Sequence, residues 1–81
     1  METLNDAEAS ALAASLGCLT ERELTVLSDA TPGTVEAWRK RGKGPAYVLF
    51  GNRFLYPRLA VSEHLQTLIR ERSRAPVKGV L

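Results

Sequence analysis

Basic side chains that could contact a polyanion are concentrated in the middle of the chain. Arg39, Lys40 and Arg41 follow one another directly, and Lys43 comes two residues later. Arginine and lysine are long enough to reach phosphate oxygens, and the guanidinium group of arginine also matches the O6 and N7 atoms of guanine. The chemistry that these residues could perform is recognition of a nucleic acid.

The apolar residues of the segment 32–41 indicate which of its side chains face solvent. Val35 and Trp38 are three residues apart, as expected for the core-facing side of a helix. On the opposite side Thr34 could bond a base edge or a phosphate. Glu36 could accept a hydrogen bond from cytosine N4 or form a salt bridge with Lys40 one turn later. The solvent-facing candidates are Gly33, Thr34, Glu36, Ala37, Lys40 and Arg41, with Arg39 beside them.

A β-hairpin is predicted after this segment, with β-prone runs at 47–50 and 53–56 around a glycine-containing turn. A two-residue loop would pair Phe50 with Arg53. A three-residue loop would instead pair Phe50 with Phe54, and it would place four large apolar side chains on one face. We favour the three-residue loop because one face of a small hairpin must be covered to be stable.

Polar residues at this hairpin complete the candidate binding set. Asn52 and Arg53 would lie at the exposed tip, and an arginine there suits insertion into a narrow minor groove. Lys43 and Arg58 either add contacts to the nucleic-acid backbone or belong to the ordinary solvated surface. The aromatic residues are expected in the core rather than stacked on bases, namely Trp38, Phe50, Phe54 and Tyr56.

Residues suited to catalysis, or to holding a metal or cofactor, form no recognisable pattern. His64 is the single histidine, and its neighbours in sequence would point to different sides of a helix. Gly42 and Gly44 precede a predicted strand, whereas a phosphate-binding loop precedes a helix. Cys18, the single cysteine, excludes an internal disulfide and a cysteine-cluster metal site, and we expect it to be a small buried residue. We therefore expect no enzymatic activity, no metal and no cofactor.

Four helices are predicted to position the candidate residues. Asn5 and Thr20, each followed three positions later by a glutamate, are N-cap candidates that predict helices over 6–16 and 21–28. A threonine cap and a proline at the first position predict a third helix over 32–41, and the short link before it is typical of a helix-turn-helix. Pro57 ends the second strand and starts the last helix. The apolar residues of that helix are Val61, Leu65, Leu68 and Ile69.

The chain has the length of one domain, and its charges are divided between two halves. Residues 1–36 contain one base and seven acids, whereas residues 37–81 contain ten bases and two acids. Such asymmetry favours a polyanionic partner, with nucleic acid ahead of a membrane surface. No apolar run approaches the ~20 residues of a membrane span, and the acidic start is unlike a secretory signal, so we expect a cytoplasmic protein. The expected division is an acidic N-terminal helix over 1–18, a folded domain over 19–72 and a flexible basic tail over 73–81.

Several short motifs together carry a resemblance to a known family. They are Leu19-Thr20-Glu21-Arg22-Glu23-Leu24, Thr34-Val35 with Trp38-Arg39, Gly42-Lys43-Gly44-Pro45, Gly51-Asn52-Arg53 and Tyr56. The segment 19–69 thereby resembles the winged helix-turn-helix of phage-type excisionases and MerR-like DNA-binding domains. The resemblance implies a mainly α fold, consisting of a helix-turn-helix, a short β-hairpin wing and a C-terminal helix, with an extra helix at the N-terminus.

This resemblance also implies a function and partners. Helix 32–41 would enter the major groove of double-stranded DNA, and the loop 51–53 would contact the backbone or the minor groove. Members of the family act as recombination directionality factors that bend DNA beside an integrase, or as small transcriptional regulators. We expect the first role, with an integrase as partner, and keep the second as an alternative. A different class of function is a protein-interaction adaptor that uses the acidic N-terminal helix.

Three positions depart from the family pattern. Asp29 replaces the glycine usual in the turn, so either it adopts the left-handed conformation or the turn differs. Glu36 and Ala37 stand where basic residues are common, which makes the centre of the helix electrostatically poor for DNA. Ala60 replaces a common acidic N-cap, and Pro57 could move the start of the last helix earlier.

A domain of this size covers only part of a DNA site, so we expect self-association on DNA. The opposite charges of the two halves favour head-to-tail contacts on direct repeats, an arrangement that the resemblance also implies. The competing arrangement is a two-fold dimer through Leu12 and Leu16 on an inverted repeat.

Overall fold

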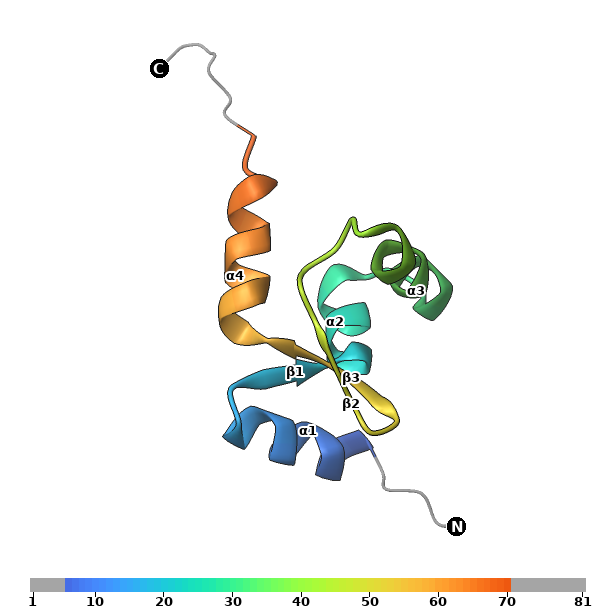
Figure 1. The fold of residues 1–81 in the computed structure, drawn as a ribbon, viewed down its shortest axis with the longest axis vertical. Helices are drawn as coiled ribbons and strands as arrows, with labels where there is room; N and C mark the ends of the chain where they lie inside the picture. The colour runs from blue at the N-terminus through green and yellow to red at the C-terminus, as the bar shows by residue number, and fades with distance from the viewer. Residues whose placement is uncertain (1–5, 71–81) are drawn as a thin grey trace.

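The computed structural model describes residues 6–70, which form four helices and a three-stranded antiparallel sheet. The chain order is α1 (Asp6–Ser15), β1 (Cys18–Thr20), α2 (Glu21–Ser28), α3 (Pro32–Arg41), β2 (Val48–Phe50), β3 (Arg53–Pro57) and α4 (Arg58–Thr67) (Figure 1). The helices expected at 6–16, 21–28 and 32–41 are thus confirmed within one residue. The basic tail expected over 73–81 lies outside the described residues, as does the N-cap expected at Asn5.

The sheet has the order β1-β3-β2, with the hairpin strand β3 in the centre. Strand β1, which was not predicted, pairs with β3 so that Leu19 lies opposite Tyr56. Three residues are too few for a period-two pattern to be recognised in the sequence. Pairing with β1 makes β3 a central strand, and this changes which side chains of the hairpin are buried.

The expected three-residue hairpin loop is wrong. Phe50 pairs with Arg53 across a two-residue turn, in which Gly51 takes a positive φ of 63°. Leu55 and Tyr56 are adjacent, so they point to opposite faces of the sheet, and both are buried. The prediction assumed one covered face, whereas this sheet is covered on two. The expectation that Phe50 is in the core is also wrong, because β2 is an edge strand and Phe50 is exposed.

The helix boundaries follow from local capping. Thr20 caps α2 in a reciprocal capping box: its hydroxyl accepts from the Glu23 backbone N–H, and the Glu23 carboxylate accepts from the Thr20 backbone N–H. Asp29 ends α2 in the left-handed conformation with φ 57°, which is the first of the two alternatives expected for it. The Thr31 side chain caps α3, and Gly42 ends α3 with φ 68°.

The core lies between α2, α3, α4 and one face of the sheet. Leu24, Val35, Tyr56 and Val61 form its buried cluster, and Trp38 and Phe54 pack against this cluster while partly buried. The core positions expected for Tyr56, Trp38 and Phe54 are therefore confirmed, the last two in part.

Helix α1 lies on the other side of the sheet (Figure 1). It buries Ala9 and Ala13, whereas Leu12 in the helix and Leu16 in the turn that follows it remain exposed. The Ser10 hydroxyl donates a hydrogen bond to the Glu23 carboxylate, which connects α1 to the start of α2.

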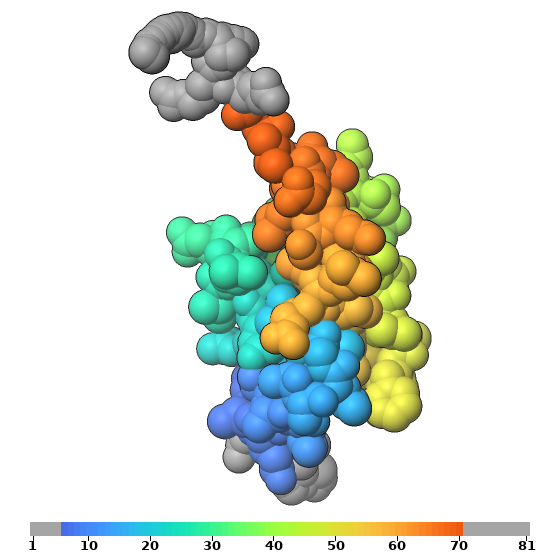
Figure 2. Space-filling model, turned by 90° about the vertical axis from the view of Figure 1, so that its left-hand side faces the viewer, coloured from blue at the N-terminus to red at the C-terminus, as the bar shows by residue number. Residues whose placement is uncertain are grey.

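Helix α4 begins at Arg58, immediately after Pro57 and two residues before Ala60, so the earlier start is confirmed. The Arg58 backbone N–H donates to the Gly17 carbonyl at 2.8 Å. Of the four apolar residues that predicted this helix, only Val61 is buried, whereas Leu65, Leu68 and Ile69 are exposed. Figure 1 shows α4 extending away from the sheet, and in Figure 2 the C-terminal end of the described residues, in orange, reaches the top of the coloured part of the molecule. None of the helices among residues 6–70 is long and apolar enough to cross a membrane.

Candidate nucleic-acid interface

A buried side chain and a tight connection help to fix the orientation of helix α3 relative to α2. Val35 is 1% exposed and points into the core, which fixes the rotation of α3 about its axis. The connection 29–31 is closed by backbone hydrogen bonds from Asp29 to Val26 at 3.1 Å and from Ala30 to Thr25 at 3.2 Å. The opposite face of α3 is therefore presented to solvent in a defined orientation.

The solvent face of α3 contains a shallow hollow of about 240 Å³, lined by Gly33, Glu36, Ala37, Lys40 and Arg41. Five of the six residues predicted for this face thus lie together around one surface feature. Thr34, the sixth, is exposed, and its hydroxyl lies 2.9 Å from the hydroxyl of Thr31 at the helix start. Small residues at 33 and 37 keep this surface open to a ligand.

Glu36 and Lys40 form an ion pair on this face. Their charged atoms are 2.9 Å apart, one helical turn from each other, and both side chains are largely exposed. The hydrogen bond from Lys40 lowers the pKa of Glu36. Of the two alternatives for Glu36, the free protein adopts the salt bridge.

Arg39 does not lie on the solvent face. Its side chain is only 13% exposed, and its Nε donates to the Glu21 carboxylate at 3.1 Å. The guanidinium carbon lies 3.6 Å above the centre of the Phe54 ring, a cation–π contact. The expected placement of Arg39 beside the DNA-facing residues is therefore wrong in this structure, where Arg39 belongs to the packing between α2, α3 and β3.

Glu21 is the central acceptor of this cluster, and the sequence analysis did not identify it. The same carboxylate oxygen, Oε2, accepts from Arg39 and from the hydroxyl of Tyr56, the latter at 2.9 Å. Burial, together with the hydrogen bond to Glu21, raises the pKa of Tyr56 to about 12. A buried tyrosine hydroxyl needs a hydrogen-bond partner, and this was the available signal that an acceptor lies near Tyr56.

The polar residues predicted around the hairpin separate into two groups. Asn52 is exposed in the β2–β3 turn, and Arg53 is half-buried at the start of β3 rather than in a loop. This turn and α3 lie on the same side of the molecule in Figure 1. Lys43 is exposed just after α3, whereas Arg58 begins α4 beside Gly17, on the opposite side from α3.

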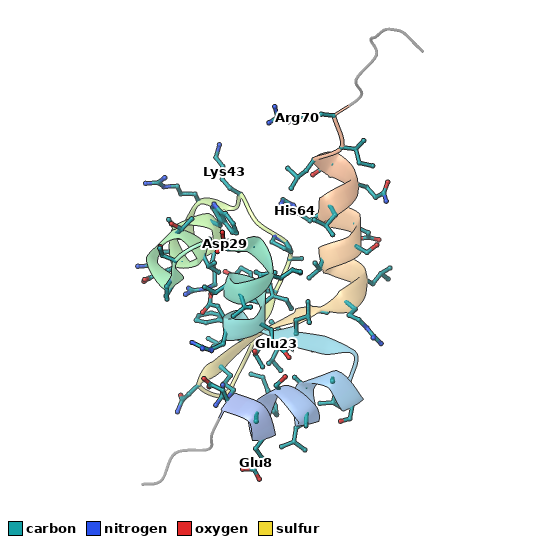
Figure 3. The ribbon with its side chains drawn as sticks, turned by 180° about the vertical axis from the view of Figure 1, so that it is seen from behind. Glu8, Glu23, Asp29, Lys43, His64 and Arg70 are labelled. Carbon is teal, nitrogen blue, oxygen red and sulfur yellow. The ribbon has the colours of Figure 1, made fainter. Side chains whose placement is uncertain are left out.

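The other titratable candidates are not assembled into a reactive site. Among the residues described, no three histidine, cysteine, aspartate or glutamate side chains are grouped so that they could hold a metal ion. Cys18 is half-buried rather than fully buried. His64 lies on α4 and faces the loop that carries Lys43 (Figure 3).

No protein-family model matches the chain, and neither the curated proteins nor the solved structures gave a match.

Proposed function

We propose that this chain is a sequence-specific DNA-binding protein of the winged helix-turn-helix type. Helix α3 enters the major groove, and the β2–β3 turn contacts the backbone or the minor groove. The observation that carries the proposal is the solvent face of α3, where small residues and the long side chains of Lys40 and Arg41 surround a shallow hollow. This face follows the hydrogen-bonded connection between α2 and α3. A helix presented in this way can approach base edges closely.

The charges near this face supply the attraction to DNA. Lys40, Arg41 and Lys43 lie on or just after α3, and Arg53 lies at the hairpin on the same side. Glu36 offsets part of this charge, but a phosphate near Lys40 can replace the carboxylate as its partner. Binding then leaves Glu36 available to accept from cytosine N4.

Within this proposal, the chain acts as a recombination directionality factor that bends DNA beside an integrase. The resemblance of the segment 19–69 to excisionases supports this role, and transcriptional regulation is the alternative for the same fold. One module of this size buries only about 600–1,000 Å² of its surface on DNA, so we propose that several copies bind side by side.

Salt dependence of binding tests the proposal. If four basic side chains contact phosphates, a plot of log K against log salt concentration has a slope of about −3 to −4. Fluorescence anisotropy with a labelled duplex, from about 50 mM to about 300 mM salt, measures this slope. A slope near zero would contradict the proposal and favour a protein-interaction adaptor.

Two arginine variants give a matched comparison. Arg41→Ala is expected to reduce the slope by about one if Arg41 contacts a phosphate, and to alter the preference among sites if it contacts a guanine. Arg58→Ala removes the same charge on the opposite side of the molecule and is expected to leave the slope unchanged. Equal effects of the two variants would show that only total charge matters and that α3 has no special role.

A further inference from the structure

An apolar groove lies between α2, α4 and the loop that follows α3. Its volume is about 560 Å³, in the range of sites that bind ligand groups. Its lining includes Leu27, Trp38, Lys43, His64, Leu65 and Leu68. Leu27, Leu65 and Leu68 are each more than half exposed, so the groove presents large apolar side chains that no other described part of the chain covers.

The polar groups of the groove favour an acidic occupant. Lys43 is the charged residue of the lining, and Figure 3 shows it on the loop opposite His64 of α4. Arg70 lies just beyond α4, on the same end of the molecule (Figure 3). A helix with apolar side chains would contact the leucines of such a groove, and acidic residues on the same helix would lie near its basic side chains.

Helix α1 of the same chain has these properties. Leu12, in the helix, is 58% exposed, and Leu16, in the turn that follows the helix, is 72% exposed. The first turn carries Glu8 and Asp6, of which Asp6 already pairs with Arg22 of α2, and the helix contains no basic residue. Burial of Ala9 and Ala13 holds α1 on the sheet while the leucines point elsewhere.

The two surfaces lie at opposite ends of the molecule. Figure 1 shows α1 on one side of the sheet, and α4 with the loop after α3 on the other. A chain therefore cannot place its own α1 in its own groove without unfolding. A second copy can supply the helix.

We propose that α1 of one copy, together with the turn that follows it, docks through Leu12 and Leu16 into the groove between α2 and α4 of a second copy. The contact joins two different surfaces, so each molecule offers one helix and one groove. This contact requires no DNA, so its test is independent of the test of the proposed DNA binding.

Complementation between two variants tests the contact. Leu12→Asp with Leu16→Asp removes the helix surface, and Leu65→Glu with Leu68→Glu removes the groove surface. All four positions are exposed, so both variants are expected to fold. Circular dichroism of each variant checks that its helix content equals that of the wild type. In sedimentation equilibrium from about 5 µM to about 500 µM, the wild type is expected to associate and each variant alone to remain monomeric, with dissociation constants raised at least about tenfold.

The equimolar mixture gives the decisive result. It is expected to form a one-to-one complex, because one variant keeps the groove and the other keeps the helix. Leu59→Glu, at an exposed α4 position outside the groove, is the control and should associate like the wild type. A wild type that stays monomeric, a mixture that does not associate, or a Leu59→Glu variant as defective as the groove variant would each overturn the proposal.

Discussion

Replacing Arg39 separates a structural role of the basic run from a DNA-binding role. Arg39 joins three elements: its guanidinium bonds Glu21 of α2 and lies on the ring of Phe54 of β3, while its backbone belongs to α3. Arg39→Ala removes both contacts and leaves the Glu21 carboxylate with the Tyr56 hydroxyl as its remaining side-chain donor in the cluster. We expect the variant to lose stability rather than to bind DNA more weakly in its folded form.

The size of the loss follows from the geometry. A hydrogen bond to a charged group contributes about 1.5–3 kcal/mol, and a cation–π contact contributes about 0.5–2 kcal/mol. The Glu21 side chain is 28% exposed, so water can partly solvate it once Arg39 is gone, and the loss falls in the lower part of the combined range. We expect a decrease of about 2–3 kcal/mol in the free energy of unfolding, which lowers the melting temperature by about 10–20 °C in a domain of this size.

Urea denaturation followed by the fluorescence of Trp38, the single tryptophan, measures this change. Arg41→Ala is the matched control, because Arg41 is exposed on the same helix, and its stability should stay within about 0.5 kcal/mol of the wild type. A double-mutant cycle with Glu21→Gln should give a coupling energy of about 1 kcal/mol or more between the two side chains. If Arg39→Ala unfolds at the wild-type urea concentration but no longer binds DNA, the assignment of Arg39 to the core packing is refuted.

Three further predictions concern protonation and backbone conformation. Because the pKa of Tyr56 is raised to about 12, the folded protein holds this proton more tightly than the unfolded chain does. The stability that this proton contributes should be fully present below pH ~10, and the free energy of unfolding should fall by up to about 2 kcal/mol as the pH rises toward 12. In urea titrations at high pH, Tyr56→Phe should lose this dependence. The pKa of Glu23 is lowered by hydrogen bonds from the Ser10 hydroxyl and from the Thr20 backbone, so the stability that Glu23 contributes should be present above pH ~4.5. This stability should disappear as the pH falls through the lowered pKa, and Ser10→Ala should weaken this acid sensitivity. Asp29→Gly should raise the free energy of unfolding by about 0.5–1 kcal/mol, since glycine adopts the left-handed conformation without steric cost, and a lower urea midpoint would contradict the capping argument.

Local signals in the sequence were sufficient to predict the bounds of the helices but not to predict the strand pairing of the sheet. Capping residues act over three or four positions, so Thr20, Glu23 and Thr31 define helix starts without knowledge of the rest of the fold. The hairpin register depends on what covers each face of β3, and that is decided by β1 and α1, which are distant in sequence. The prediction failed at the step where a long-range contact selects between two locally acceptable turns.

In the candidate interface too, the side-chain positions that depend on local spacing were predicted, and those that depend on distant residues were not. The rotation of α3 was predicted from Val35 and Trp38, and five residues of its solvent face lie around one hollow as a result. The position of Arg39 could not be obtained from spacing on its own helix, because it depends on an acid in α2 and an aromatic ring in β3.

The basic run at the end of α3 also shows why adjacent charges do not act as one patch. Successive residues of an α-helix are rotated by about 100°, so three consecutive bases cannot all face one partner. Arg39 points inward to Glu21, Lys40 pairs with Glu36 on the solvent face, and Arg41 is exposed at the end of the helix. If α3 enters the major groove as proposed, Lys40 and Arg41 are the members of this run that are placed to contact DNA. Lys40 must first leave its ion pair with Glu36, whereas Arg41 is in none of the ion pairs described above. Arg41 should therefore contribute more to discrimination among sites than either of its basic neighbours.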